Sequence, residues 1–190
     1  MFGLFKRKKP YEQEAALLVG TISMQSRRLE FYEEFEVPDT TEGRFDLLLV
    51  HLFLLISRIK DEPGGDVLAQ SVFDTAFLNI DEGYREIGIS DMGVPKRMKK
   101  LMLAFNGRMH AYSEAIKAGL PELEKALDRN IYNIVNIQNG AVLPSLAEYI
   151  LANKDYLEKQ SREHIFSGHI EFKEPVLIKE GEERKHATSQ

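Results

Sequence analysis

The chain has 190 residues, of which 43% are apolar and 29% are charged, the balance of an ordinary folded domain. Cysteine is absent, which excludes disulfides, thiolate catalysis and cysteine-based zinc or iron–sulfur sites. The net charge of −5 argues against nucleic acid as the main partner, since proteins that bind nucleic acid usually carry a basic excess.

The N-terminal segment, residues 1–10, combines aromatic and basic side chains. They are Phe2, Phe5, Lys6, Arg7, Lys8 and Lys9. Anionic lipid attracts such a basic run by about 1 kcal/mol per charge, and nearby aromatic rings can enter the bilayer interface. The segment therefore predicts weak, reversible contact with a membrane surface. An accidental basic cluster on a disordered start is the alternative.

The order of charged and apolar residues in this segment differs from that of a secretory signal peptide, in which the charges come first. The most apolar stretch, residues 45–56, is interrupted by Asp46 and His51. It is also shorter than the roughly 18 apolar residues that a membrane-spanning helix needs. We therefore expect a cytoplasmic protein, and we leave open peripheral contact with the inner face of the cytoplasmic membrane.

Hydrophobic periodicity predicts about six helices and no strand of useful length before residue 170. The predicted helices cover residues 11–35, 41–60, 67–87, 95–118, 120–134 and 141–160, with proline, glycine and polar residues between them. The fold class is therefore predicted to be all-α, with a single helical domain at residues 11–165. The residues beyond it, 166–190, predict a C-terminal tail that is loose and partly extended.

The second predicted helix is apolar on nearly all sides, which is typical of a central helix. We interpret His51 within it as a core histidine whose ring N–H is satisfied by a neighbouring carbonyl. A ligand or proton carrier in the core is the alternative. Asp46, near the start of the same helix, is interpreted as a carboxylate favoured by the helix dipole and not as a catalytic acid.

The fourth predicted helix combines an apolar stripe with a basic face. The stripe consists of Val94, Met98, Leu101, Met102, Phe105, Met109, Tyr112 and Ile116. Residues 95–117 carry six bases against one acid, whereas residues 61–94 carry eight acids against one base.

The side opposite the stripe holds Lys96, Lys99, Lys100, Leu103, Gly107 and His110. A leucine among lysines, beside a glycine that permits close approach, predicts a contact surface for a partner. A solvated basic face with one stray leucine is the alternative.

Patterns of catalytic or cofactor-binding residues are absent. There is no nucleophile elbow and no phosphate-binding glycine loop, and the five histidines are scattered. We therefore predict a non-enzymatic protein, without a metal or a cofactor, that acts by binding another protein. An enzyme, the alternative, would require a pocket with paired titratable groups near His51 or His110.

A family resemblance is carried by four blocks in a fixed order: FDLLLVHLFLL at 45–55, AQSVFD at 69–74, GISDMGVPKRMKK at 88–100 and AFNGR at 104–108. Together they resemble the ubiquinol–cytochrome c chaperone family, closely over residues 44–112 and loosely elsewhere. The resemblance implies an all-α fold and a role in assembly of the cytochrome bc1 complex of the respiratory chain. The implied client is cytochrome b, the membrane-embedded haem subunit, or another early subunit.

The resemblance also implies where the client binds, because the family pattern is densest between residues 91 and 108. The residues expected to bind the partner are Asp91, Lys96, Arg97, Lys99, Lys100, Leu103, Gly107 and Arg108. The N-terminus lacks an arginine-rich presequence, so the chain resembles a bacterial member working at the cytoplasmic face of the inner membrane. The need for a second assembly factor is left open. A helical lipid- or quinone-binding protein at the membrane surface is the other function considered, and it predicts a hydrophobic cavity and co-purified lipid.

Overall fold

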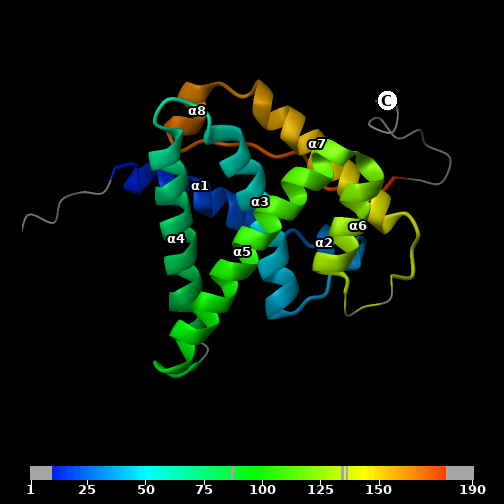
Figure 1. The fold of residues 1–190 in the computed structure, drawn as a ribbon, viewed down its shortest axis with the longest axis horizontal. Coiled ribbons are helices and arrows are strands. Elements are labelled where there is room, and N and C mark those ends of the chain that lie inside the picture. Colours follow the sequence, from blue (N-terminus) through cyan, green and yellow to red (C-terminus); the bar gives the residue numbers. More distant parts are fainter. Residues whose placement is uncertain (1–9, 87, 134, 136, 179–190) are drawn as a thin grey trace, which may run out of the picture.

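The computed structural model describes residues 10–86, 88–133, 135 and 137–178, and this part of the chain is all-α, as predicted (Figure 1). Its eight helices are α1 Glu12–Gln25, α2 Glu30–Glu33, α3 Thr41–Ile59, α4 Gly65–Glu86, α5 Gly93–Ala118, α6 Leu120–Ile131, α7 Val142–Lys159 and α8 Arg162–Phe166. Five of the predicted helices correspond to α3 to α7, with ends that differ by at most a few residues.

Helix α3 forms the centre of the domain because its sequence is apolar on every side. Helices α1, α4, α5, α6 and α7 all pack against it, so side chains that point in different directions, such as Leu47, Leu49 and Leu52, are all buried. Each buried leucine contributes about 1.5–3 kcal/mol relative to an exposed one. The helix begins at the N-cap Thr40, whose hydroxyl accepts a hydrogen bond from the Gly43 N–H at 3.1 Å.

Helices α4 and α5 form a long hairpin whose tip projects from the rest of the domain (Figure 1). Aromatic rings join the two helices: Phe73 and Phe77 of α4 have ring centroids 4.3 Å apart, and Phe105 of α5 lies 5.2 Å from Phe73. Further along, α5 crosses α3 and packs against α6 (Figure 1). The tip side of α5 is little covered, since Val94 is the only buried residue between residues 91 and 104.

The helix predicted at residues 11–35 is wrong in one respect, because the structure has two helices there, α1 and α2, joined by a turn. The Ser26 hydroxyl donates to a carbonyl one turn earlier at 3.2 Å, and the Tyr32 hydroxyl donates to the Ser26 carbonyl at 2.8 Å. Such side-chain bonds compete with the continuous helical pattern. The turn buries Phe31, whereas Leu29 is 66% exposed.

The chain after α7 contains a short helix, α8, that was not predicted. Its N-cap is Ser161, whose hydroxyl accepts a hydrogen bond from the His164 N–H at 3.2 Å. Periodicity did not reveal this helix because it is little more than one turn long. No helix in the described part of the chain is both long enough and apolar enough to span a bilayer.

The described part of the C-terminal tail, up to residue 178, is extended, as predicted, and is attached to α7. Two buried polar side chains of α7 hold it. Asn153 Oδ1 accepts a hydrogen bond from the Lys173 N–H at 2.7 Å, and Ser145 Oγ accepts one from the Ile178 N–H at 2.8 Å. These bonds account for two of the five buried polar residues in the described part of the chain.

Candidate partner-binding surface

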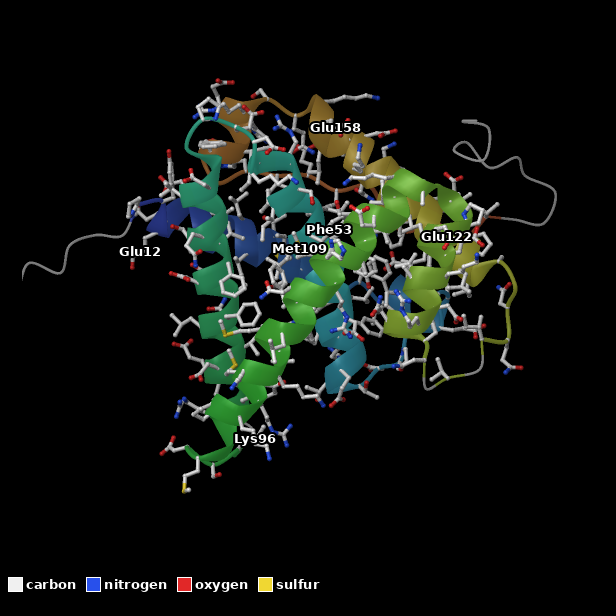
Figure 2. All side chains as sticks on the ribbon, viewed as in Figure 1. Glu12, Phe53, Lys96, Met109, Glu122 and Glu158 are labelled. Carbon is white, nitrogen blue, oxygen red and sulfur yellow. The ribbon has the colours of Figure 1, made fainter. Side chains whose placement is uncertain are left out.

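The outer side of α5 carries a set of exposed residues, which we call the basic face: Lys96, Lys99, Lys100, Leu103, Gly107 and His110. Leu103 is 65% exposed, whereas Val94, Phe105 and Tyr112 on the opposite side are buried. The predicted exposure of the basic face is therefore confirmed, whereas the opposite stripe is buried or half-buried except at Met102. Figure 2 shows Lys96 near the tip of the hairpin, far from Met109 and Phe53 in the middle of the domain.

The lysines of the basic face are not neutralised within the described ranges. No carboxylate there forms an ion pair with Lys96, Lys99 or Lys100. The first turn of α5 has no acidic residue. Lys96 thus lies at the positive end of the helix dipole, where a cation costs about 0.3–1 kcal/mol. The N-terminal half of α5 therefore carries positive charge on its exposed side that no described carboxylate pairs with.

Two further residues of the predicted contact set, Asp91 and Arg97, lie at the tip and contact α4. Arg85 forms an ion pair with Asp81 at 2.7 Å and another with Asp91. The guanidinium carbon of Arg97 lies 5.8 Å from the centre of the Tyr84 ring. Both Asp91 and Arg97 are exposed, so they border the basic face while they also close the hairpin.

Arg108, the last residue of the predicted contact set, points into the domain. Its guanidinium forms an ion pair with the Asp46 carboxylate of α3 at 2.7 Å, and its side chain is only 19% exposed. Burial raises the pKa of Asp46 to about 7, although the positive charge of Arg108 acts to lower it. The interpretation of Asp46 as a group that only serves the helix dipole is therefore incomplete, since the pair also attaches α5 to α3.

Two exposed methionines were not recognised as surface residues from the sequence. Met92, which precedes α5, is 92% exposed, and Met102 is 44% exposed beside Leu103. The assignment of Met102 to the buried stripe is wrong, because it lies at the edge of that stripe, where no neighbouring helix covers it. Flexible methionine side chains adapt to partners of different shape.

The interpretation of His51 as a core histidine is confirmed. The ring is fully buried, with Nδ1 at 2.7 Å from the Leu47 carbonyl oxygen and Nε2 at 2.8 Å from the Tyr149 hydroxyl. A carbonyl can only accept, so Nδ1 carries the proton and Nε2 accepts from Tyr149. Burial lowers the pKa of His51 to about 4 and keeps the ring neutral. Both ring nitrogens are therefore occupied within the core.

A cleft of about 300 Å³ lies between α1, α3 and α4. Neither His51 nor His110 lines it, and its walls are largely apolar. Among the residues that the structure describes, no group of three or more histidine, aspartate or glutamate side chains is placed to hold a metal ion. The predicted membrane-contact residues, Phe2, Phe5, Lys6, Arg7, Lys8 and Lys9, lie outside the described part of the chain.

Comparison with known proteins agrees with this architecture. A family model described as "Ubiquinol-cytochrome C chaperone" matches residues 33–172. The chain is 38% identical to a protein whose structure is described as "Crystal structure of the Cbp3 homolog from Brucella abortus". The two structures align with a TM-score of 0.76 over 90% of this chain and 95% of that one.

More distant similarity links the chain to eukaryotic assembly factors. It is 23% identical over 130 residues to ubiquinol-cytochrome-c reductase complex assembly factor 1 of Xenopus laevis, covering 68% of this chain and 64% of that protein. It is also 23% identical over 137 residues to ubiquinol-cytochrome c reductase complex assembly factor 1 of Mus musculus, covering 72% and 46%. The chain thus spans between 46% and 64% of the length of these relatives.

Proposed function

The chain belongs to the ubiquinol–cytochrome c chaperone family, and from this premise we propose that it is a non-enzymatic chaperone for assembly of the ubiquinol–cytochrome c reductase (bc1) complex. Its client in this proposal is cytochrome b or another early subunit. The chaperone works at the cytoplasmic face of the membrane, where residues 2–9 add weak contact with the lipid surface, alone or with a second assembly factor.

The observation that carries the client-binding proposal is the unpaired charge of the basic face. Three exposed lysines without carboxylate partners in the described ranges precede an exposed leucine on the same side of α5. Charges of this kind accelerate encounter with an acidic segment and orient it, and they contribute less to the final affinity. The leucine, with Met102 beside it, supplies a modest apolar contact once the client is aligned.

This arrangement suits temporary binding. An exposed ion pair contributes about 0–1 kcal/mol, so a few lysines and one leucine bind the client weakly. The client can then dissociate when it joins its complex. The Lys96 end of this surface lies near the tip of the projecting hairpin (Figure 2). Arg108 has a supporting role in the proposal, since its ion pair with Asp46 fixes the position of α5.

Photocrosslinking tests the location of the client surface. A photoreactive amino acid in place of Leu103 is expected to capture cytochrome b or another early bc1 subunit in cells, because the side chain is 65% exposed on the basic face. The captured partner is identified by mass spectrometry. The matched control is Leu78 on the outer side of α4, which is 57% exposed. Equal capture at both positions, or recovery of lipid alone from position 103, would contradict the proposal.

Charge reversal tests the electrostatic part of the same proposal. The double substitution Lys99→Glu, Lys100→Glu is expected to reduce client capture about tenfold or more, since it replaces attraction by repulsion. Folding should be unchanged because both side chains are exposed. The control is the double substitution Lys60→Glu, Lys159→Glu, which changes the net charge by the same amount at two exposed lysines outside the basic face. Capture is measured by co-purification at low and high salt, and an equal loss for both double variants would count against a localised surface.

A further inference from the structure

The cleft between α1, α3 and α4 has the size and lining of a small-molecule site. Its volume of about 300 Å³ is about twice that of an engineered cavity of about 150 Å³ that binds benzene. It also falls at the lower end of the range for ligand pockets, about 300–1,000 Å³. Its walls include Val19, Phe45, Leu48, Ala76, Ile80 and Tyr84. Ser23, Ser26, Thr41 and Asn79 also line it, so a single alkyl chain matches the volume and the apolar part of the walls.

Two arginines, Arg27 and Arg44, also line the cleft. Arg44 forms an ion pair with Asp39 at 2.6 Å. Arg27 is exposed, and no carboxylate in the described ranges pairs with it. One guanidinium is therefore left to receive a singly charged anion.

The space in the cleft is maintained by a glycine. Gly83 lies within α4 and lines the cleft, and a Cβ atom placed there would meet no other atom within 4 Å. Glycine inside a helix costs about 0.5–1 kcal/mol relative to alanine. No close approach of another residue requires glycine at this position. The open volume is thus retained at some cost to the stability of α4, which favours an occupant.

We propose that this cleft binds a fatty acid anion, with the alkyl chain against the apolar walls and the carboxylate on Arg27. A guanidinium fork matches a carboxylate in geometry as well as in charge. A neutral quinone or an alcohol would leave Arg27 unused, and the single free guanidinium matches one negative charge. This inference does not depend on the chaperone proposal, since it concerns a different surface of the molecule.

Titration of the full chain with a series of fatty acids, followed by amide NMR below their micelle concentrations, tests this inference. Decanoate is expected to shift the amide signals of residues that line the cleft on all three helices. Affinity should rise about fourfold for each added methylene until the cleft is full. Decanol, which has the same chain length without the charge, should bind about fivefold or more weakly than decanoate. Arg27→Gln should remove that difference.

Gly83→Leu provides the blocking variant, because a Cβ at this position lining the cleft meets no atom within 4 Å and the change removes an unfavourable helix glycine. It is expected to lose decanoate binding by about tenfold or more. Gly107→Leu is the matched control, since it adds the same side chain at an exposed helix glycine that also has open space. Unchanged binding to Gly83→Leu would overturn the proposal, as would equal binding of decanol and decanoate. Shifts at the same residues with an acidic bc1 subunit peptide but none with decanoate would assign the cleft to the client instead.

Discussion

Replacing Arg108 with methionine is expected to lower the free energy of unfolding by about 3–5 kcal/mol under alkaline conditions, because it leaves the buried Asp46 carboxylate without its cation. The cost depends on pH. Asp46 has a pKa of about 7 in the folded protein, and loss of the arginine removes the charge that lowers it. Well below this pH the carboxyl is neutral, and we expect a cost of only about 1–2 kcal/mol.

A double-mutant cycle monitored by denaturant unfolding checks this expectation. Replacing both partners, Asp46→Leu with Arg108→Met, should recover most of the lost stability, since a buried pair can often be exchanged for apolar residues at little cost. Capture of the client should be weaker in Arg108→Met even at temperatures where the variant is folded, because α5 loses its attachment to α3. A cost below about 1 kcal/mol at every pH would show that the pair is solvated.

Asp46→Asn is expected to make the protein sensitive to mild acid, although it removes an unfavourable charge. His51 has a pKa of about 4 in the folded state, against an ordinary value of 6.5. Below pH 6.5 the unfolded state therefore binds a proton that the folded state does not bind. Stability therefore falls as the pH falls. The loss amounts to about 2 kcal/mol by roughly pH 5, at about 1.4 kcal/mol per pH unit.

In the wild-type chain the buried aspartate offsets this loss. The pKa of Asp46 is raised from 3.8 to about 7, so between these values the folded state binds the additional proton and stability rises as the pH falls. The two contributions have opposite signs and similar sizes over about pH 5 to 7. Wild-type stability should therefore change little in this window. Asp46→Asn should lose about 2 kcal/mol there, and His51→Leu should become relatively more stable in acid than at neutral pH.

Equilibrium unfolding at several pH values between about 5 and 7 measures these slopes. Hydrogen bonds from Arg28 and Lys117 lower the pKa of Glu30 and of Glu114 respectively. These two groups therefore affect stability mainly below the ordinary glutamate pKa of 4.5, outside this window. A wild-type protein that loses stability as steeply as Asp46→Asn would contradict the compensation, and so would an Asp46→Asn variant with a flat profile.

Periodicity predicted most of the helices and the orientation of α5 because these features depend on local spacing. A helix that is apolar on all sides, such as α3, is stable only at the centre of a helical domain. An apolar stripe along one side of α5 shows which of its lysines face outward. The role of His51 followed from the same reasoning, since a histidine in an apolar helix needs partners for both ring nitrogens.

Features that depend on distant parts of the chain could not be predicted in this way. Arg108 was assigned to the contact surface because the family pattern is densest between residues 91 and 108, but its partner Asp46 is brought to it by the crossing of α3 and α5. The break between α1 and α2 depends on side-chain bonds of Ser26 and Tyr32 that leave no periodic signal. The cleft is formed by three helices, and the only local signal for it, a glycine at position 83 within α4, becomes informative once the neighbours are known.

A series of hydrogen bonds runs from His51 through Tyr149 and Gln25 to the backbone carbonyl of Lys173. This network also limits how early in synthesis the domain can finish folding. Its hydrogen bonds join residues 98, 124 and 148 positions apart. A helical protein closed by such distant contacts is expected to fold more slowly than a bundle of sequential neighbours. During synthesis, α1 and α3 cannot pack against α7 and the tail until those segments have been made. Their apolar surfaces stay exposed until then. The nascent chain therefore spends part of its own synthesis in an aggregation-prone state.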